Sequence, residues 1–232
     1  MSRAPGFPTR GFILNFARLG LVCLAGYGLS CASSNPSLGA SRLPDGSLQV
    51  KGPLAGPYPS LEELALNACE LMTRQPGASN GLYGFEYCAL NYFSKEKNAY
   101  FLSYLSSFRE KLDSITFKTC SMPTSLNDPS HPDAVIIGFN HTHPHSRAFS
   151  KPDLSAWIRW NPSRSGARNP ERIRDRHLML FYRERTGECR TYIFNLATRI
   201  VAALREGHWI PIGEVYTPEG DIRMFDNKDW LP

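Results

Sequence analysis

Two histidines and an aspartate lie close together in the middle of this 232-residue chain. His141 and His143 follow the apolar run 134–138, which predicts a buried strand. Alternate residues at the end of a strand point to the same side, so both imidazoles can face one point. Asp153 would join them from the next predicted helix. Two imidazoles and one carboxylate, with a fourth position left for water, form the ligand set of a catalytic zinc site, and the sequence therefore predicts bound Zn²⁺ here.

The same residues have a simpler explanation. Two histidines that flank a small residue occur by chance, and Ser150 followed by Asp153 is also typical of a helix N-cap with an acid three residues on. A buried strand that ends in a capped helix would account for most of the pattern. The combination is more specific than either part alone, so we expect a metal site and not a coincidental copy.

The pattern resembles the signature of the JAMM (MPN+) metalloproteases, in which a distant Glu precedes His-x-His, a spacer and Ser-x-x-Asp. The matching residues here are His141-Thr-His143-Pro, Ser150 and Asp153. The spacer, residues 144–149, is one residue shorter than in most of the family. Bacterial branches vary this spacer and carry Phe-Ser-x-x-Asp, as this chain does at 149–153. The bacterial domain of unknown function DUF4329 is of this kind, and the resemblance covers roughly residues 60–215.

The resemblance implies an upstream glutamate that acts as general base from an earlier strand. Glu86 fits this position, because the surrounding residues 82–93 are aromatic and apolar and predict a strand. A carboxylate inside such a strand is costly unless it has a partner, and a metal-bound water would be a suitable one. The alternative is an ordinary strand residue that faces solvent.

The resemblance also implies a reaction, the hydrolysis of a peptide or isopeptide bond. Zinc would lower the pKa of its bound water toward about 7, and Glu86 would pass a proton from that water to the leaving amine. Zinc and the Ser150 hydroxyl would stabilise the oxyanion. We expect cell-wall peptides or a secreted protein as substrate. The superfamily includes MPN domains that only bind partners, so a non-catalytic interaction module or a toxin-associated envelope protein remains the alternative.

The N-terminus predicts export. Three arginines precede a short apolar run at 19–29, which is typical of a signal peptide over residues 1–30 and too short for a membrane span. Leu29-Ser-Cys31 resembles a bacterial lipobox, although Gly28 stands where Leu is usual. Cys31 would then carry a lipid anchor, and the residues after it resemble those of lipoproteins sorted to the outer membrane. Ordinary cleavage, which would give a soluble secreted protein, is the alternative.

Composition limits the partners of the mature chain. The formal net charge is +5, and residues 1–30 contribute three Arg and no acid, which leaves about +2 (5 − 3). This balance does not favour nucleic acid as a partner. About 200 residues remain, enough for one well-buried domain, which we place at 60–232. Residues 31–59 are rich in Ser, Pro and Gly without periodicity, and they predict a flexible tether.

The order of predicted elements indicates an α+β fold. The resemblance implies a JAB/MPN-like central mixed sheet flanked by helices, with a cytidine-deaminase-like architecture. A helix begins at a capping box at Ser60. The other expected elements are strands at 82–93, 99–105, 115–118 and 134–139, a loop at 120–132, a helix at 151–160, hairpins at 177–194 and 209–225, and an ambiguous segment at 197–205.

The sequence does not decide whether the four cysteines of the domain form disulfides or remain thiols. They are Cys69, Cys88, Cys120 and Cys189. They include no Cys-x-x-Cys pair, which argues against a structural zinc knuckle. In an exported chain they would form one or two disulfides, with three possible full pairings, or they would remain buried thiols.

An arginine-rich stretch follows the predicted metal helix. Residues 159–176 contain six arginines and two acids, interrupted by Pro and Gly, and predict a long loop. This loop would bind carboxylate or phosphate groups at the rim of the cleft, or it would simply face solvent or lipid headgroups.

Overall fold

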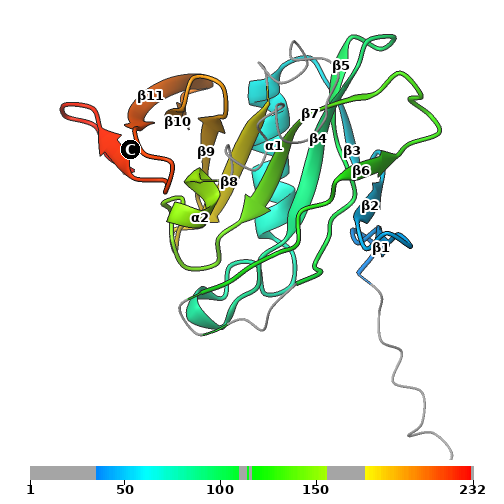
Figure 1. The fold of residues 1–232 in the computed structure, drawn as a ribbon, viewed down its shortest axis with the longest axis horizontal. Helices are drawn as coiled ribbons and strands as arrows, with labels where there is room; N and C mark the ends of the chain where they lie inside the picture. Colours follow the sequence, from blue (N-terminus) through cyan, green and yellow to red (C-terminus); the bar gives the residue numbers. More distant parts are fainter. Residues whose placement is uncertain (1–34, 110–113, 115–116, 156–175, 231–232) are drawn as a thin grey trace, which may run out of the picture. The chain divides into compact units, whose positions relative to one another are not determined.

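The computed structural model describes residues 35–109, 114, 117–155 and 176–230 (Figure 1). Two sheets dominate this part of the chain. The larger has nine strands in the order β12-β11-β10-β9-β8-β7-β4-β5-β3, and the smaller has the order β1-β2-β6. The protein is thus mixed α and β with mostly sheet, which agrees with the α+β prediction at this coarse level.

The elements have the following bounds. The large sheet contains β3 (Ala55–Tyr58), β4 (Cys88–Ser94), β5 (Ala99–Leu102), β7 (Val135–Thr142), β8 (His177–Arg183), β9 (Cys189–Asn195), β10 (Ile200–Arg205), β11 (His208–Val215) and β12 (Ile222–Met224). The small sheet contains β1 (Ala40–Arg42), β2 (Leu48–Lys51) and β6 (Ser125–Asn127). The helices are α1 (Leu61–Thr73), the 3-10 turn η1 (Gly81–Tyr83) and α2 (Lys151–Leu154).

One connection in the large sheet differs from the others. Strands β7 and β8 are parallel, whereas the other described pairings in this sheet are antiparallel. A parallel pair requires a crossover instead of a tight turn. That crossover begins with the segment that carries Ser150 and Asp153, so the topology brings α2 back beside the end of β7.

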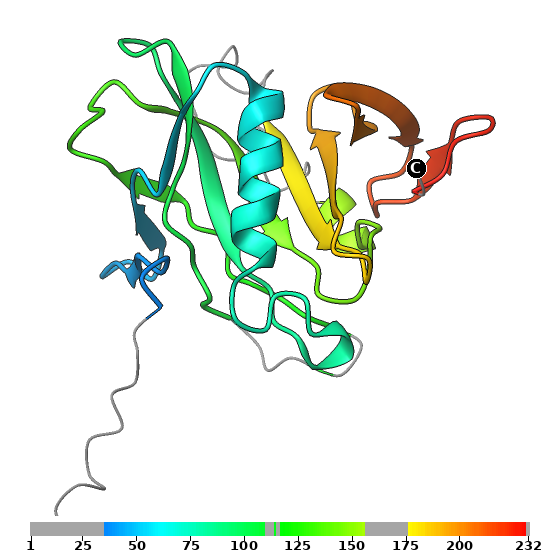
Figure 2. The same ribbon diagram turned by 180° about the vertical axis from the view of Figure 1, so that it is seen from behind.

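The two faces of the large sheet are covered differently. Helix α1 lies on one face and α2 on the other, as the two opposite views show (Figures 1 and 2). Successive side chains of β8 project from opposite faces of the sheet. Met179 and Phe181 belong to the hydrophobic cluster that contains the α1 residue Leu64, whereas Leu180 belongs to the cluster that contains the α2 residue Leu154. This alternation is the period of two expected of a strand buried on both sides.

Helix α1 begins where the capping box predicts. The Ser60 hydroxyl accepts a hydrogen bond from the backbone N–H of Glu63 at 3.1 Å. The buried residues of the helix follow at helical spacing: Leu64, Ala65, Ala68, Cys69 and Met72. The predicted core-packing helix is therefore confirmed.

The flexible tether is a wrong prediction for residues 36–59. This segment contributes β1 and β2 to the small sheet and β3 to the large one. Leu48 and Val50 alternate with polar residues and are buried, a short strand pattern that the surrounding Gly and Pro obscure. Strand β3 contains Pro57 and lies at the edge of the sheet, where a residue without an N–H is tolerated. The signal peptide and Cys31 lie outside the described residues.

Several element boundaries also differ from the predictions. The strand expected at 82–93 begins only at Cys88, because glycine-containing turns occupy the residues before it. The loop expected at 120–132 contains the strand β6. In the segment 115–118, expected to be a strand, the described residues Phe117 and Lys118 lie in no strand. The segment 197–205, ambiguous between helix and strand in the sequence, contains the strand β10. Helix α2 is described only to Leu154, and both 156–160 and most of the arginine-rich stretch lie outside the described residues. The two late hairpins are confirmed.

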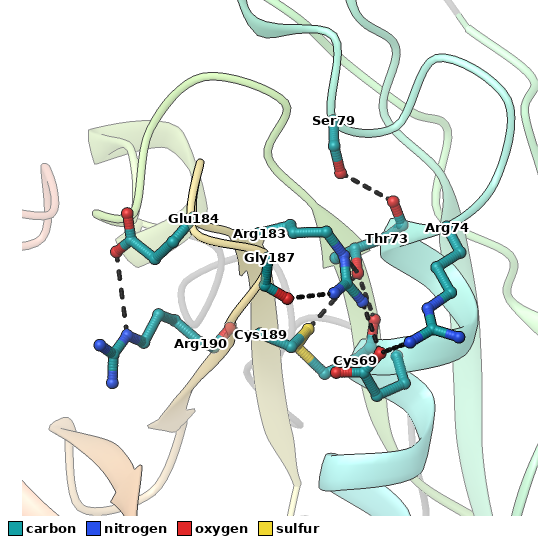
Figure 3. Close-up of a disulfide and its surroundings, with 10 residues drawn as sticks. Cys69, Thr73, Arg74, Ser79, Arg183, Glu184, Gly187, Cys189 and Arg190 are labelled. Carbon is teal, nitrogen blue, oxygen red and sulfur yellow. Dashed lines mark hydrogen bonds and ion pairs between the residues drawn. A yellow bond between two sulfur atoms is a disulfide. The ribbon is translucent and has the colours of Figure 1, made fainter.

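Both cysteine pairs form disulfides. Cys69 joins Cys189, with their Cα atoms 6.0 Å apart, and Cys88 joins Cys120 at 5.7 Å. The first bond ties α1 to β9 across 120 residues. Beside it, Arg183 donates a hydrogen bond to the Thr73 hydroxyl (Figure 3). Arg183 also donates to the Glu70 carboxylate. One of the three possible pairings is thus selected.

Candidate metal centre

The end of β7 positions both histidines. His141 is the Cα partner of Cys88 in β4 and of Leu180 in β8, so it lies in the middle of the sheet. The backbone N–H of His143 donates to the carbonyl of Phe181 at 2.9 Å, which continues the ladder one residue past the strand. Both imidazoles therefore project from the same face, and both are buried.

The start of α2 positions the aspartate. Ser150 is the N-cap residue of this helix, and its side chain accepts from the backbone N–H of Asp153 at 3.3 Å. In return, Asp153 Oδ2 accepts from the backbone N–H of Ser150 at 2.8 Å, which completes a capping box. Ser150 and Asp153 therefore do form a helix cap, as the simpler explanation predicts. The same cap holds the Asp153 carboxylate in the position that faces the histidines.

The three side chains converge with spacings suited to one metal ion. His141 Nε2 and His143 Nε2 are 3.1 Å apart. Asp153 Oδ2 is 3.5 Å from His141 Nε2 and 3.4 Å from His143 Nε2. Ligands of a tetrahedral zinc with bonds of 2.0–2.1 Å lie about 3.3–3.4 Å from one another. The residues present fit a tetrahedral ion with three protein ligands and one remaining position.

The electrostatics of the site keep its carboxylate ionised. Burial raises the pKa of Asp153, but electrostatic attraction to His141, together with hydrogen bonds from His141 and His143, outweighs burial and holds that pKa well below its usual range. A carboxylate must be deprotonated to bind a metal ion. Asp153 is therefore in the protonation state that a ligand needs at neutral pH.

Glu86 reaches the same site from a different element than expected. It does not lie within a strand but in the turn just before β4. Its Oε1 atom is 3.6 Å from His143 Nε2, and the residue is only 6% exposed. The next residue, Tyr87, is held against β7: its N–H donates to Thr142 Oγ1, and its carbonyl accepts from the N–H of Thr142, both at 3.0 Å. The strand prediction for Glu86 is wrong, whereas its proximity to the histidines is real.

Ser150 has an engaged hydroxyl. Its Oγ atom donates to Asp153 Oδ2 at 2.7 Å. This is the same oxygen that lies closest to the two histidines. In this arrangement the Ser150 proton is directed at the carboxylate and not toward an open ligand position.

Other contacts hold the imidazole rings. The ring centroid of Phe149 lies 6.0 Å from that of His141, with the two rings tilted by 44°. The Nδ1 atoms of His141 and His143 are buried, and neither has a hydrogen-bond partner among the described residues. Metal-binding histidines usually donate from the second nitrogen to a carbonyl or carboxylate. Ring orientation here depends on packing more than on such bonds.

The sequence predicts no structural role for two residues that shape this site, although Thr142 belongs to the His-Thr-His-Pro motif. Thr142 lies between the histidines and fixes the backbone of Tyr87, as described above. Gly84 lies so close to Pro144 that a Cβ on it would approach the Pro144 Cβ to 2.4 Å. Sequence features mark both residues: Thr142 lies in the motif His-Thr-His-Pro, and Gly84 is one of the glycines before Glu86. Their role depends on contacts between distant segments, which no local pattern reveals.

Known proteins add no assignment. A scan against protein-family models finds no match, and a search of curated proteins finds no similar sequence. What this centre can do chemically therefore depends on the placement of His141, His143, Asp153 and Glu86.

Proposed function

We propose that this protein is a zinc-dependent hydrolase of amide bonds, acting on a peptide or isopeptide at the bacterial cell envelope. The observation that carries the proposal is the triangle formed by His141 Nε2, His143 Nε2 and Asp153 Oδ2, with edges of 3.1 to 3.5 Å. A triangle of two nitrogens and one oxygen at this spacing matches the protein side of a catalytic zinc site. The finer architecture, a JAB/MPN-like and cytidine-deaminase-like sheet, is part of the same proposal.

The residues then take distinct roles. His141, His143 and Asp153 hold the ion, and bound zinc would activate a water and polarise the carbonyl to be attacked. Glu86 accepts a proton from the water at its carboxylate as the water oxygen bonds to the carbonyl carbon. It then delivers that proton to the amide nitrogen as the C–N bond breaks. Glu86 is buried within 3.6 Å of His143 Nε2, so it is close enough to act on a group held at this centre.

The role of Ser150 changes from the first expectation. Because its hydroxyl donates to Asp153 Oδ2, we assign it to positioning the ligand and not to stabilising the oxyanion. Hydrogen bonds that orient a ligating carboxylate affect metal affinity directly. Of the two groups first expected to stabilise the oxyanion, zinc and the Ser150 hydroxyl, only zinc would then do so.

Export and lipid anchoring complete the proposal. Two disulfides in the domain suit an oxidising compartment such as the periplasm or cell surface. Within the described residues, no helix is long and apolar enough to cross a membrane. We propose that lipid on Cys31 anchors the mature chain to the outer membrane. Replacing Cys31 with Ser should release the chain into a soluble fraction or leave an unprocessed precursor, and equal fractionation and mass of both forms would refute the anchor.

A second candidate is a non-catalytic interaction module, including a toxin-associated envelope protein. It is favoured by the exposed apolar side chains of Leu82, Tyr83 and Phe85 beside the site, which suit protein recognition with or without hydrolysis. The deciding experiment measures zinc in the purified domain and screens cell-wall peptides and envelope proteins for cleavage. Zinc with cleavage supports the hydrolase. Zinc-free protein that still captures a partner supports the module.

A further inference from the structure

The turn that delivers Glu86 presents apolar side chains to solvent. Leu82 is 45%, Tyr83 82% and Phe85 39% exposed, although Glu86 directly after them is buried. These three residues, which we call the aromatic turn, are consecutive except for Gly84. Exposed apolar side chains scattered singly are ordinary, but a group beside a candidate active site marks a binding surface.

The aromatic turn is held in a defined conformation. The backbone N–H of Phe85 donates to the carbonyl of Gly77 at 3.0 Å, and that of Gly84 donates to the carbonyl of Gly81 at 3.0 Å. Gly81 adopts a φ of +62°, which favours glycine at this position. The backbone that carries the apolar side chains is therefore fixed before any ligand binds, which reduces the backbone entropy lost on binding.

The turn also lies against the metal loop. Gly84 packs on Pro144, the residue that follows the ligand His143, so closely that a Cβ would not fit. On its other side the turn continues into Glu86, whose carboxylate is 3.6 Å from His143 Nε2. A substrate placed at the candidate metal centre would thus lie next to the backbone of the aromatic turn at Gly84.

A second segment extends the apolar surface. Ser106 and Cys88 exchange backbone hydrogen bonds of 2.8 and 2.9 Å, so the residues after Ser106 run antiparallel to those before Cys88. This places Phe108, which is 40% exposed, beside the aromatic turn. The Arg109 guanidinium lies 4.7 Å from the ring centroid of Phe85 and orders that ring. The Cys88–Cys120 disulfide brings a third segment to this place, and the backbone N–H of Ser121 donates to the carbonyl of Phe108 at 2.6 Å.

We propose that Leu82, Tyr83 and Phe85 bind an aliphatic or aromatic side chain of a peptide, next to the bond that the candidate metal centre cuts. This inference rests on the proposed function for its choice of occupant, because the surface is continuous with Glu86 and His143. A lipid surface or a second copy of this chain seated on the turn would cover the approach to the centre, so a peptide is the occupant consistent with hydrolysis.

The test uses the mature chain carrying Glu86→Gln, so that bound peptides stay intact. The probes are short fluorescent Ser/Gly peptides that differ only in one central residue, Phe, Leu, Ser or Lys. Fluorescence anisotropy should show that the Phe and Leu peptides bind about tenfold or more tightly than the Ser peptide. Tyr83→Ser combined with Leu82→Ser should abolish this preference. Matched controls are Tyr216→Ser and Leu66→Ser, which alter side chains of similar exposure elsewhere and should retain it.

Other results would overturn the inference. These are equal binding of the four peptides, no binding of the Phe peptide, or an unchanged preference in the double variant. Binding of the turn to phosphatidylglycerol vesicles without peptide discrimination, or self-association that Leu82→Ser removes, would assign the surface to a membrane or to a dimer. Failure of the hydrolase proposal looks different: the peptide preference would persist while the unmodified chain binds no zinc and cleaves none of the peptides.

Discussion

The Ser150 hydroxyl donates a hydrogen bond of 2.7 Å to Asp153 Oδ2. The same oxygen lies 3.4 and 3.5 Å from the Nε2 atoms of His143 and His141. One carboxylate oxygen thus completes a helix cap and faces the two histidines of the candidate metal centre at once. The capping interaction and the ligand geometry are a single feature, so the conventional and the catalytic explanations of Ser-x-x-Asp do not compete.

Ser150→Ala should therefore weaken zinc binding. Loss of a hydrogen bond that orients a ligand reduces metal affinity by about 10- to 100-fold. Loss of the N-cap should also destabilise the protein by about 1 kcal/mol. Ser150→Thr keeps a hydroxyl at this position and should restore most of the affinity. If Ser150→Ala keeps its zinc affinity and loses only hydrolytic rate, Ser150 acts on the oxyanion and the positioning role is wrong.

The mature chain should bind about one zinc ion per molecule, since one cluster of three ligands fits a single tetrahedral ion. Elemental analysis of protein purified without added metal measures this. His141→Ala with His143→Ala should remove the ion and lower the midpoint of thermal unfolding measured with zinc, because zinc stabilises only the folded state. His208→Ala alters an exposed histidine and should change neither. A metal-free chain, or metal retained in the double variant, contradicts the site.

The sequence was sufficient to predict that His141, His143 and Asp153 meet, because the placement of each is local. His141 and His143 follow an apolar strand at a spacing of two, and Asp153 follows its own N-cap, so each side chain is directed by the element that carries it. The late hairpins were predictable for the same reason. The strand β7 extends to Thr142 and includes His141, beyond the predicted end of the strand, since pairing with both neighbours prolongs it.

Features that depend on distant segments were not predictable. Within residues 36–59, β1 pairs locally with β2, but β2 and β3 also pair with the distant strands β6 and β5. Glu86 reaches the site in a turn that Thr142 fixes, a contact across 55 residues. The disulfide pairing depends on the fold that brings α1 to β9. Propensity and periodicity report the preferences of a local segment, and tertiary pairing decides these cases.

Peptide mapping under non-reducing conditions should find Cys69 joined to Cys189 and Cys88 joined to Cys120. Replacing each pair by alanines should destabilise the protein, and unfolding in urea measures the loss. The chain-entropy model predicts that the bond spanning 120 residues stabilises about 1 kcal/mol more than the bond spanning 32. Either of the other two pairings in the native protein would contradict the structure.

Asp128→Asn should destabilise the protein in a pH-dependent way. Asp128 Oδ2 accepts from the Tyr92 hydroxyl at 2.6 Å and from His131 Nδ1 at 2.7 Å. Burial raises the pKa of Asp128, but these hydrogen bonds outweigh burial and lower that pKa below its ordinary value. Because the folded pKa is depressed, the ionised carboxylate stabilises the fold above the unfolded value of about 4, and this stabilisation is lost as the pH falls through the folded pKa.

The measured quantity is the free energy of unfolding in urea as a function of pH. At pH 7 the variant should lose about 2 kcal/mol, the cost of removing charge-assisted hydrogen bonds from a buried group. The difference from the unmodified protein should narrow below pH ~4. Asp226→Asn changes an exposed carboxylate and should show little difference at any pH. A loss that does not vary with pH would mean that shape, and not charge, explains the role of Asp128.

Glu86→Gln should separate chemistry from metal binding. Glutamine keeps the size and polarity of the side chain in its buried turn but cannot accept a proton, so hydrolysis should fall by roughly a hundredfold or more while zinc content and folding persist. Glu63→Gln, on the exposed face of α1, is the matched control and should leave the rate unchanged. Loss of zinc in Glu86→Gln would make Glu86 a ligand. Full activity with zinc retained would mean that a group other than Glu86 acts as the base, although the Glu86 carboxylate lies 3.6 Å from His143 Nε2.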